Sequence, residues 1–254
     1  MRHDRDAGGE PGILEEKARL REAIWSRLEE EGVDRFPGAR GRIPNFTGAE
    51  AAADRLADTD AWRSASTVKA NPDSPQWPVR QRALEAGKRV FMAVPRLAGE
   101  DPFFLLDPDE LEVSPREASS IKGASRHGRT VPVEALEPVD LVVSGCVAAD
   151  PAGARLGKGG GFSDLEYAVA AEAGLVQPAT PVATTVHELQ LLAAGEIPLV
   201  DHDVRLDLVA TPDRVVRTEV SRDGHPGIDW KELTEEKIRA IPLLQRLRRA
   251  REGA

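Results

Sequence analysis

The run Val139-Asp140-Leu141-Val142-Val143-Ser144-Gly145-Cys146-Val147, which a glycine-rich loop and then a helix follow, decides the fold class. It is short and rich in β-branched residues, and Pro138 and Asp150-Pro151 bound it, which is typical of a buried strand. The helix is predicted over residues 164–173, with Gly174 as its stop signal. Strand, loop and helix in this order predict an α/β unit.

Short apolar strands alternate with helices on both sides of this run. This alternation predicts one α/β domain with three layers, in which helices cover both faces of a mostly parallel central sheet. Residues 36–46 are expected to form an ordered loop, and residues 99–131 have no clear period, so their structure stays open. The predicted helices span 13–31, 49–61, 79–86, 187–194 and 230–254 with an interruption at Pro242, and the predicted strands span 67–71, 89–95, 180–186, 206–211 and 215–218.

Charge and composition narrow the class of protein. The 254 residues include 34 Lys and Arg against 43 Asp and Glu, a net charge of −9, which argues against a general nucleic-acid binder. The sequence has neither a long apolar run nor the apolar core of a signal peptide, so we expect a cytoplasmic protein without a membrane partner. The single cysteine, Cys146, excludes an internal disulfide. We expect a disordered lead-in over 1–12, the α/β domain over 13–220 and a charged helical extension over 221–254.

The most informative motif is Gly153-Ala154-Arg155-Leu156-Gly157-Lys158-Gly159-Gly160-Gly161-Phe162-Ser163-Asp164. Glycines allow positive φ and close backbone approach, so consecutive amides can converge on a phosphate at the start of the following helix. Arg155 and Lys158 add positive charge there. The spacing fits neither a Walker A loop nor a dinucleotide fingerprint. A flexible loop or a tight backbone crossing is the alternative interpretation, and anion binding is preferred.

Other residues have both a functional and a structural interpretation. Lys17 and Arg21 share one helix face, although such a pair alone is more often solvated surface charge. Asp164 and Asp203, judged alone, are typical of helix caps or turns. His187 suits acid–base chemistry because an ordinary histidine pKa is about 6.5, yet a structural role explains it equally well. Cys146 is better explained as a core residue than as a nucleophile.

Residues 155–164 resemble the nucleotide loop of the 5-formyltetrahydrofolate cyclo-ligase (methenyltetrahydrofolate synthetase) family. Lys17 and Arg21 match the family's Lys-x-x-x-Arg pair, and Gln190, Pro198 and residues 202–211 resemble its closing segment, so the resemblance spans about 13–218. It implies a NagB/RpiA/CoA-transferase-like fold. It also implies the ATP- and magnesium-dependent conversion of 5-formyltetrahydrofolate to 5,10-methenyltetrahydrofolate, with release of ADP and phosphate.

The resemblance also implies roles for individual residues, without a protein nucleophile. Asp164 and Asp203 would hold Mg²⁺, and Arg155 and Lys158 would act directly in catalysis. The residues expected to bind the nucleotide are Lys17, Arg21, Arg155, Gly157, Lys158, Gly159, Gly160, Gly161, Phe162, Ser163 and Asp164.

The sequence departs from the family pattern at two places. Phe162-Ser163 replaces the family's Tyr-Tyr pair, and Asp73 and Gln76 stand where the family has Glu and Thr. Residues 42–46, 68–76, 162–167 and 186–190 instead resemble a paralogous branch, the methenyltetrahydrofolate synthetase domain-containing proteins. They suggest a distinct site for a small-molecule substrate, lined by Asn71, Asp73, Gln76, Phe162, Glu166 and His187.

Two alternatives to the cyclo-ligase reaction stay open. The first is a paralogue that binds ATP but acts on another heterocycle in cofactor metabolism, such as one related to thiamine. The second is a non-catalytic nucleotide- or folate-binding protein. The expected partner is a reduced folate or related heterocycle, and the chain is expected to be a monomer or homodimer.

Overall fold

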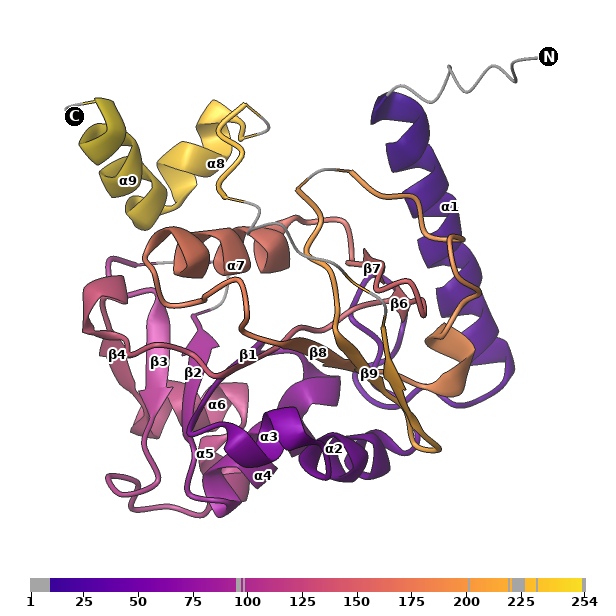
Figure 1. Cartoon of the computed structure of the whole chain (residues 1–254), viewed down its shortest axis with the longest axis horizontal. Helices are drawn as coiled ribbons and strands as arrows, with labels where there is room; N and C mark the ends of the chain where they lie inside the picture. Colours follow the sequence, from indigo (N-terminus) through magenta and orange to yellow (C-terminus); the bar gives the residue numbers. More distant parts are fainter. Residues whose placement is uncertain are drawn as a thin grey trace.

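The strands lie at the centre of the computed structural model, which describes residues 10–94, 97, 99–200, 202–218, 220, 227–231 and 233–252. Within these residues they form an eight-stranded sheet in the order β10-β9-β8-β5-β1-β2-β3-β4 (Figure 1). The strands from β9 to β2 are parallel, and β10, β3 and β4 add antiparallel edges. Their bounds are β1 (Thr67–Ala70), β2 (Arg89–Ala93), β3 (Phe103–Leu106), β4 (Arg129–Val131), β5 (Leu141–Val143), β8 (Val182–Thr185), β9 (Leu208–Ala210) and β10 (Val215–Arg217).

Helices cover both faces of this sheet. One face packs against α2 (Ala49–Ala57), α3 (Asp60–Ser64), α4 (Trp77–Glu85), α5 (Pro115–Ala118) and α6 (Ile121–His127). The other packs against α7 (Phe162–Glu172), and α8 (Glu235–Ala240) and α9 (Pro242–Glu252) lie against that helix (Figure 1). Helix α1 (Glu10–Glu30) stands at the side, next to the small β6 (Ala148–Ala149) and β7 (Arg155–Leu156) pair. The described residues also form the 3₁₀ turns η1 (Ser74–Gln76), η3 (Val133–Ala135) and η4 (Glu188–Gln190).

The two-residue period of the strands builds the two core layers. In β2, Val90 and Met92 join the cluster under α2 and α4, whereas Phe91 and Ala93 join the cluster under α7. Successive side chains of a strand point to opposite faces of the sheet, so a strand that is apolar throughout needs helices packed on both faces. The prediction of a three-layer α/β fold is confirmed.

Several predicted boundaries are corrected. The predicted helix over 49–61 is divided into α2 and α3, because Thr59 Oγ1 accepts the Trp62 amide and starts a new helix. The predicted strand over 139–147 pairs in the main sheet only at Leu141–Val143, since the chain then turns toward the glycine loop. The helix predicted over 187–194 is wrong: η4 is a single turn, closed by a capping box between His187 and Gln190.

The other segments can also be compared with their predictions. Residues 99–131, which sequence analysis left open, form β3, α5, α6 and β4. Of the predicted lead-in, residues 1–9 lie outside the described residues and residues 10–12 belong to α1. The division between 13–220 and 221–254 stays a prediction. Among the described helices, none combines the length and apolar character that crossing a bilayer requires.

Candidate functional site

The site lies where β1 and β5 end side by side. The chain continues from β1 to β2 on one side and from β5 to β8 on the other, so the direction of strand order reverses between them. Parallel α/β sheets place ligands outside the carboxyl ends of the strands at such a point. The Asn71 amide donates to Val143 O at 3.1 Å, and the Gly145 amide donates to Asn71 Oδ1 at 3.0 Å. These bonds fix the two strand ends against each other.

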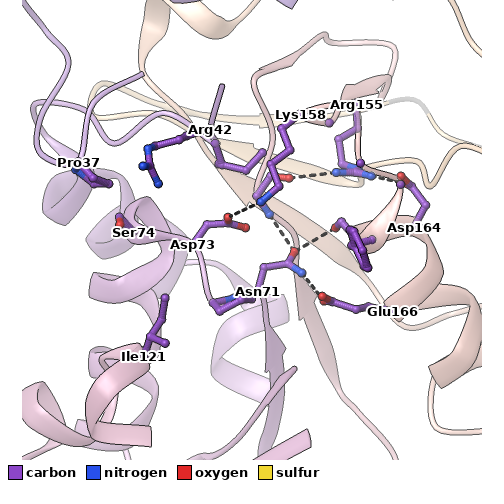
Figure 2. Close-up of a pocket in the computed structure, with 18 residues that line it drawn as sticks. Pro37, Arg42, Asn71, Asp73, Ser74, Ile121, Arg155, Lys158, Asp164 and Glu166 are labelled. Atoms are coloured by element: carbon purple, nitrogen blue, oxygen red, sulfur yellow. Dashed lines mark hydrogen bonds and ion pairs between the residues drawn. The ribbon is translucent and has the colours of Figure 1, made fainter. Parts of the chain in front are cut away.

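A cavity of about 440 Å³ opens over these strand ends, and Figure 2 shows its side chains. The loop after β1, the glycine loop and the first turn of α7 form most of its wall. Among its lining residues are Arg42, Asn71, Asp73, Gly145, Arg155, Gly157, Lys158, Gly160, Gly161, Phe162, Ser163, Asp164 and Glu166. The structure therefore brings most of the residues expected at the nucleotide and substrate sites to one place.

The glycine loop enters α7 through backbone conformations that favour glycine. Gly159 has φ of 99° and Gly161, the residue that precedes α7, has φ of 62°. The first amides of a helix have no partner within the helix and carry its positive dipole end. The loop is thus suited to an anion, as the sequence indicated.

Arg155 is the buried cation of this loop, with 3% of its surface exposed. Its guanidinium donates to Gly145 O at 3.0 Å and forms an ion pair with Asp164, while its Nε has no hydrogen-bond partner among the described residues. Burial acts to raise the pKa of Asp164, but Arg155 outweighs it and holds that pKa below its ordinary value. The pair therefore fixes a charged guanidinium at the start of α7.

Helix α1 brings two further cations to the same loop. Lys17, which is 6% exposed, forms an ion pair with Asp203. Arg21, one turn later, donates through Nε to Gly157 O at 2.7 Å. A second cavity, of about 170 Å³, is lined by both side chains together with Arg155, Asp164 and Asp203. The shared helix face predicted for Lys17 and Arg21 points at the glycine loop.

The two predicted magnesium ligands border this second cavity, but each already contacts a cation. Asp164 pairs with Arg155, and Asp203 pairs with Lys17 and accepts the Val200 amide at 2.9 Å. The described residues hold no cluster of three or more acidic, histidine or cysteine side chains suited to a metal. Mg²⁺ commonly uses one or two carboxylates and takes its other ligands from phosphates and water, and this pair fits that mode.

Glu166 is a buried carboxyl group that lines the main cavity. Glu166 Oε2 accepts from Asn71 Nδ2 at 2.6 Å and lies 3.4 Å from Lys69 Nζ. Burial raises the pKa of Glu166 even though Lys69 opposes it. Sequence analysis missed Lys69. The sequence did contain an indication: Lys69 lies inside an otherwise apolar strand, and a buried lysine needs a buried partner.

Asp73 lies across the cavity from Glu166, near the exposed Lys158. Lys158 Nζ is 3.8 Å from Asp73 Oδ1. Burial raises the pKa of Asp73, and this effect exceeds the opposing influence of Lys158 and Arg80. The cavity therefore presents two carboxylates that are harder to ionise than usual.

Two residues predicted to line the substrate pocket lie outside its lining. Gln76 is fully buried and donates to Thr185 Oγ1 at 3.2 Å. His187 accepts the Leu189 amide at Nδ1 (3.2 Å), and its ring meets the Phe46 ring edge-on at 6.1 Å between centroids. Gln76 instead contacts β8 and leaves its Oε1 without a hydrogen-bond partner among the described residues, whereas His187 closes its own 3₁₀ turn.

Arg80, which sequence analysis did not single out, holds the loop after β1 in place. It is 1% exposed and donates to three successive carbonyls, those of Asn71, Pro72 and Asp73, and to Ser119 O at 2.9 Å. Burial lowers its pKa to about 10, so it remains charged at neutral pH. Its partners are backbone carbonyls, which every residue carries, so sequence inspection gave no signal.

Cys146 should resist alkylation in the folded protein. Its Sγ is buried 3.3 Å from Thr184 Oγ1, and burial raises the pKa of the thiol to about 11. The reactive thiolate is therefore scarce at pH 8. Mass spectrometry after iodoacetamide treatment should show no modification of the native protein and complete modification in urea. Rapid labelling of the native protein would contradict the core assignment.

Most of the sequence matches the model of a known family. The model of the 5-formyltetrahydrofolate cyclo-ligase family matches residues 13–212. The chain belongs to this family. The resemblance predicted from the glycine loop and the Lys17–Arg21 pair is thus confirmed, and α8 and α9 lie beyond the part of the chain that the cyclo-ligase family model matches.

Individual relatives place the chain within the cyclo-ligase family. It is 36% identical over 247 residues to the methenyltetrahydrofolate synthase domain-containing protein of Bos taurus, covering 96% of this chain and 65% of that protein. The Homo sapiens protein of that name is 35% identical over 234 residues, with 91% and 61% covered. The chain thus spans somewhat less than two thirds of the length of these relatives.

A solved structure shows the same fold. The NMR structure of Aquifex aeolicus 5,10-methenyltetrahydrofolate synthetase superposes with a TM-score of 0.51 at 20% identity, and the match covers 82% of this chain and 95% of that one. At this identity the comparison supports the α/β architecture alone.

Proposed function

We propose that the protein is an ATP-dependent ligase that acts on a reduced folate, closing 5-formyltetrahydrofolate to 5,10-methenyltetrahydrofolate with release of ADP and phosphate. One observation carries the proposal: Lys17, Arg21, Arg155 and Lys158 gather around a glycine loop at the start of α7. Membership of the cyclo-ligase family supports it.

The chemistry needs cations and positioning more than a protein nucleophile. The formyl oxygen attacks the γ-phosphorus of ATP, the bond from that phosphorus to the bridging oxygen breaks and ADP leaves. The second folate nitrogen then attacks the activated carbon, loses its proton and displaces phosphate. Fixed positive groups and backbone amides stabilise such a transfer. Arg155 is held by its ion pair with Asp164, whereas the more exposed Lys158 forms only a 3.8 Å ion pair with Asp73, which a phosphate group would replace.

Magnesium fits the proposal as a partner of the phosphates. Asp164 and Asp203 would hold the ion, which neutralises phosphate charge when bound. Within the main cavity, Asn71, Asp73, Phe162 and Glu166 would receive the folate ring, since carboxylates accept hydrogen bonds from the N–H groups of a heterocycle.

A second candidate is an ATP-dependent reaction on another heterocycle. It is favoured by Ser163, which stands where the family pattern has a tyrosine and whose Oγ donates to Asn71 Oδ1 at 3.2 Å. It is also favoured by Asp73 and Glu166, whose carboxyl groups both line the main cavity. A panel of folates and other amino-substituted heterocycles, followed by ADP release, separates the two candidates.

Lys158→Ala should lower turnover at least about 100-fold, the effect of removing one group that stabilises the transferring charge. The assay follows methenyl absorbance with ATP, Mg²⁺ and 5-formyltetrahydrofolate. Lys122→Ala is the matched control, because Lys122 is an exposed lysine outside the cavity. Equal rates in both variants would remove Lys158 from the mechanism. ATP binding without methenyl formation by the wild type would favour the second candidate.

A further inference from the structure

The segment after β10 packs against the outer side of α7. Ile238 of α8, Ile241 between the two helices and Leu244 of α9 are buried in the same cluster as Leu165 and Val169 of α7. Thr234 caps α8 by accepting the Lys237 amide at 3.1 Å. Figure 1 shows α8 and α9 beside α7. The apolar contacts and the cap fix where the side chains of α8 point.

One of these side chains, Lys237, reaches the glycine loop. Its Nζ donates to Gly160 O at 3.2 Å and lies 5.0 Å from the centre of the Phe162 ring. A Cβ on Gly161 would lie only 3.2 Å from the same nitrogen. Among the described residues, no carboxylate forms an ion pair with it. Within the part of the chain that the structure describes, the ammonium therefore has a carbonyl and an aromatic face as partners and no ion pair.

Lys237 has a counterpart on the opposite side of the loop. Arg21 of α1 donates to Gly157 O, and Lys237 of α8 donates to Gly160 O. Cations that occupy the carbonyls of a loop leave its amides available to an anion. Both groups are partly desolvated, and burial lowers the pKa of each, with Asp203 opposing at Arg21 and Asp164 opposing at Lys237.

The space beside Lys237 is a cavity of about 230 Å³ that shares Gly159, Gly160, Gly161 and Asp164 with the neighbouring cavities. Its other polar groups are His202 and Asp229. Asp164 is neutralised by Arg155, and the exposed Asp229 accepts the Lys231 amide at 3.0 Å. Within the described residues this wall therefore carries Lys237 without an ion pair, beside the exposed Asp229, which has no ion pair either.

We propose that Lys237 binds the polyphosphate chain of the nucleotide, so that α8 completes a phosphate site begun by the family-matched region. The inference rests on the proposed nucleotide site and adds a residue beyond 212, where the family match ends. Exchange of the Gly160 carbonyl for a phosphate oxygen replaces a neutral acceptor by a charged one, which forms the stronger hydrogen bond.

The test compares Lys237→Met with Lys231→Met in the full chain. Methionine keeps an unbranched apolar side chain over Phe162 and removes the charge together with the hydrogen bond to Gly160 O. Lys231 is an exposed lysine of the same segment and lines none of the three cavities. Calorimetry measures the affinities for ATP, inorganic tripolyphosphate and adenosine. We expect Lys237→Met to weaken ATP and tripolyphosphate about tenfold or more, the effect of losing one charge-assisted contact. Adenosine binding should not change, Lys231→Met should match the wild type, and Lys237→Arg should retain most of the affinity.

Each other outcome is decisive. Wild-type affinity for both phosphate ligands in Lys237→Met overturns the assignment, and so does an equal loss for adenosine, which indicates a purely structural role. Lys237-dependent tripolyphosphate binding without folate turnover supports the assignment and rejects the cyclo-ligase reaction. Folate turnover by the wild type, together with unchanged phosphate affinity in Lys237→Met, supports the cyclo-ligase reaction and overturns the role of Lys237. Failure of the wild type to bind either phosphate ligand rejects both.

Discussion

Arg155→Met is expected to reduce ATP-dependent turnover by about 1000-fold, the upper range for removal of a group that stabilises developing charge. The substitution removes a buried guanidinium from the start of α7 and leaves the Asp164 carboxylate without its counter-charge. Loss of one partner of a buried pair typically costs about 3–5 kcal/mol of stability. Turnover and urea unfolding measure the two effects, and Arg126→Met, at an exposed arginine of α6, is the control.

The pH dependence of this variant has a defined sign. In the wild type the pKa of Asp164 is lower in the folded than in the unfolded state. The Arg155–Asp164 pair therefore stabilises the fold above the ordinary aspartate pKa, and this stabilisation is lost as the pH falls through the lowered pKa of the folded state. Without Arg155, burial raises that pKa instead, and protonation relieves the cost. The stability gap between variant and wild type should therefore narrow toward acidic pH. A gap that is constant with pH would show that Asp164 does not depend on Arg155.

A double variant separates folding from phosphate binding. Arg155→Met with Asp164→Asn removes the unpaired charge as well, so it should recover stability relative to the single variant. Turnover should stay low, because the phosphate cation is still absent. Recovery of turnover in the double variant would contradict the role of Arg155 at the phosphates.

Arg80→Met is expected to destabilise the fold by about 3 kcal/mol or more, because several buried carbonyls lose their donor and each such loss costs about 1–3 kcal/mol. Urea denaturation measures the change. Arg82→Met on the same helix is a matched control: Arg82 forms an ion pair with the exposed Asp54, and such surface pairs contribute about 0–1 kcal/mol. Equal destabilisation by the two variants would contradict the structural role of Arg80.

The local patterns of the sequence predict the fold better than they predict the floor of the site. Strand and helix periods and the glycine loop are encoded in consecutive residues, so their order is predictable. The predicted helix over 187–194 fails because the side chains of His187 and Gln190 bond to the backbone and close a single turn. Helical periodicity does not reveal that competition.

Two of the missed residues, Lys69 and Lys237, have partners that lie far away in the sequence. Lys69 meets Glu166, and Lys237 meets Gly160. Neither pair leaves a motif, since only the folded sheet and the packing of α8 on α7 bring its members together. The glycine loop and the Lys17–Arg21 pair, by contrast, are motifs within short segments and were recognisable through the family resemblance.

The attachment of the glycine loop to both α1 and α8 has a consequence for the order of folding. The bonds from Arg21 to Gly157 and from Lys237 to Gly160 are contacts of very large sequence separation, and closing such long loops is slow. Each forms only after its helix has docked. We therefore expect the glycine loop to be among the last parts of the molecule to reach its final shape, and its ordering to report that both helices are in place.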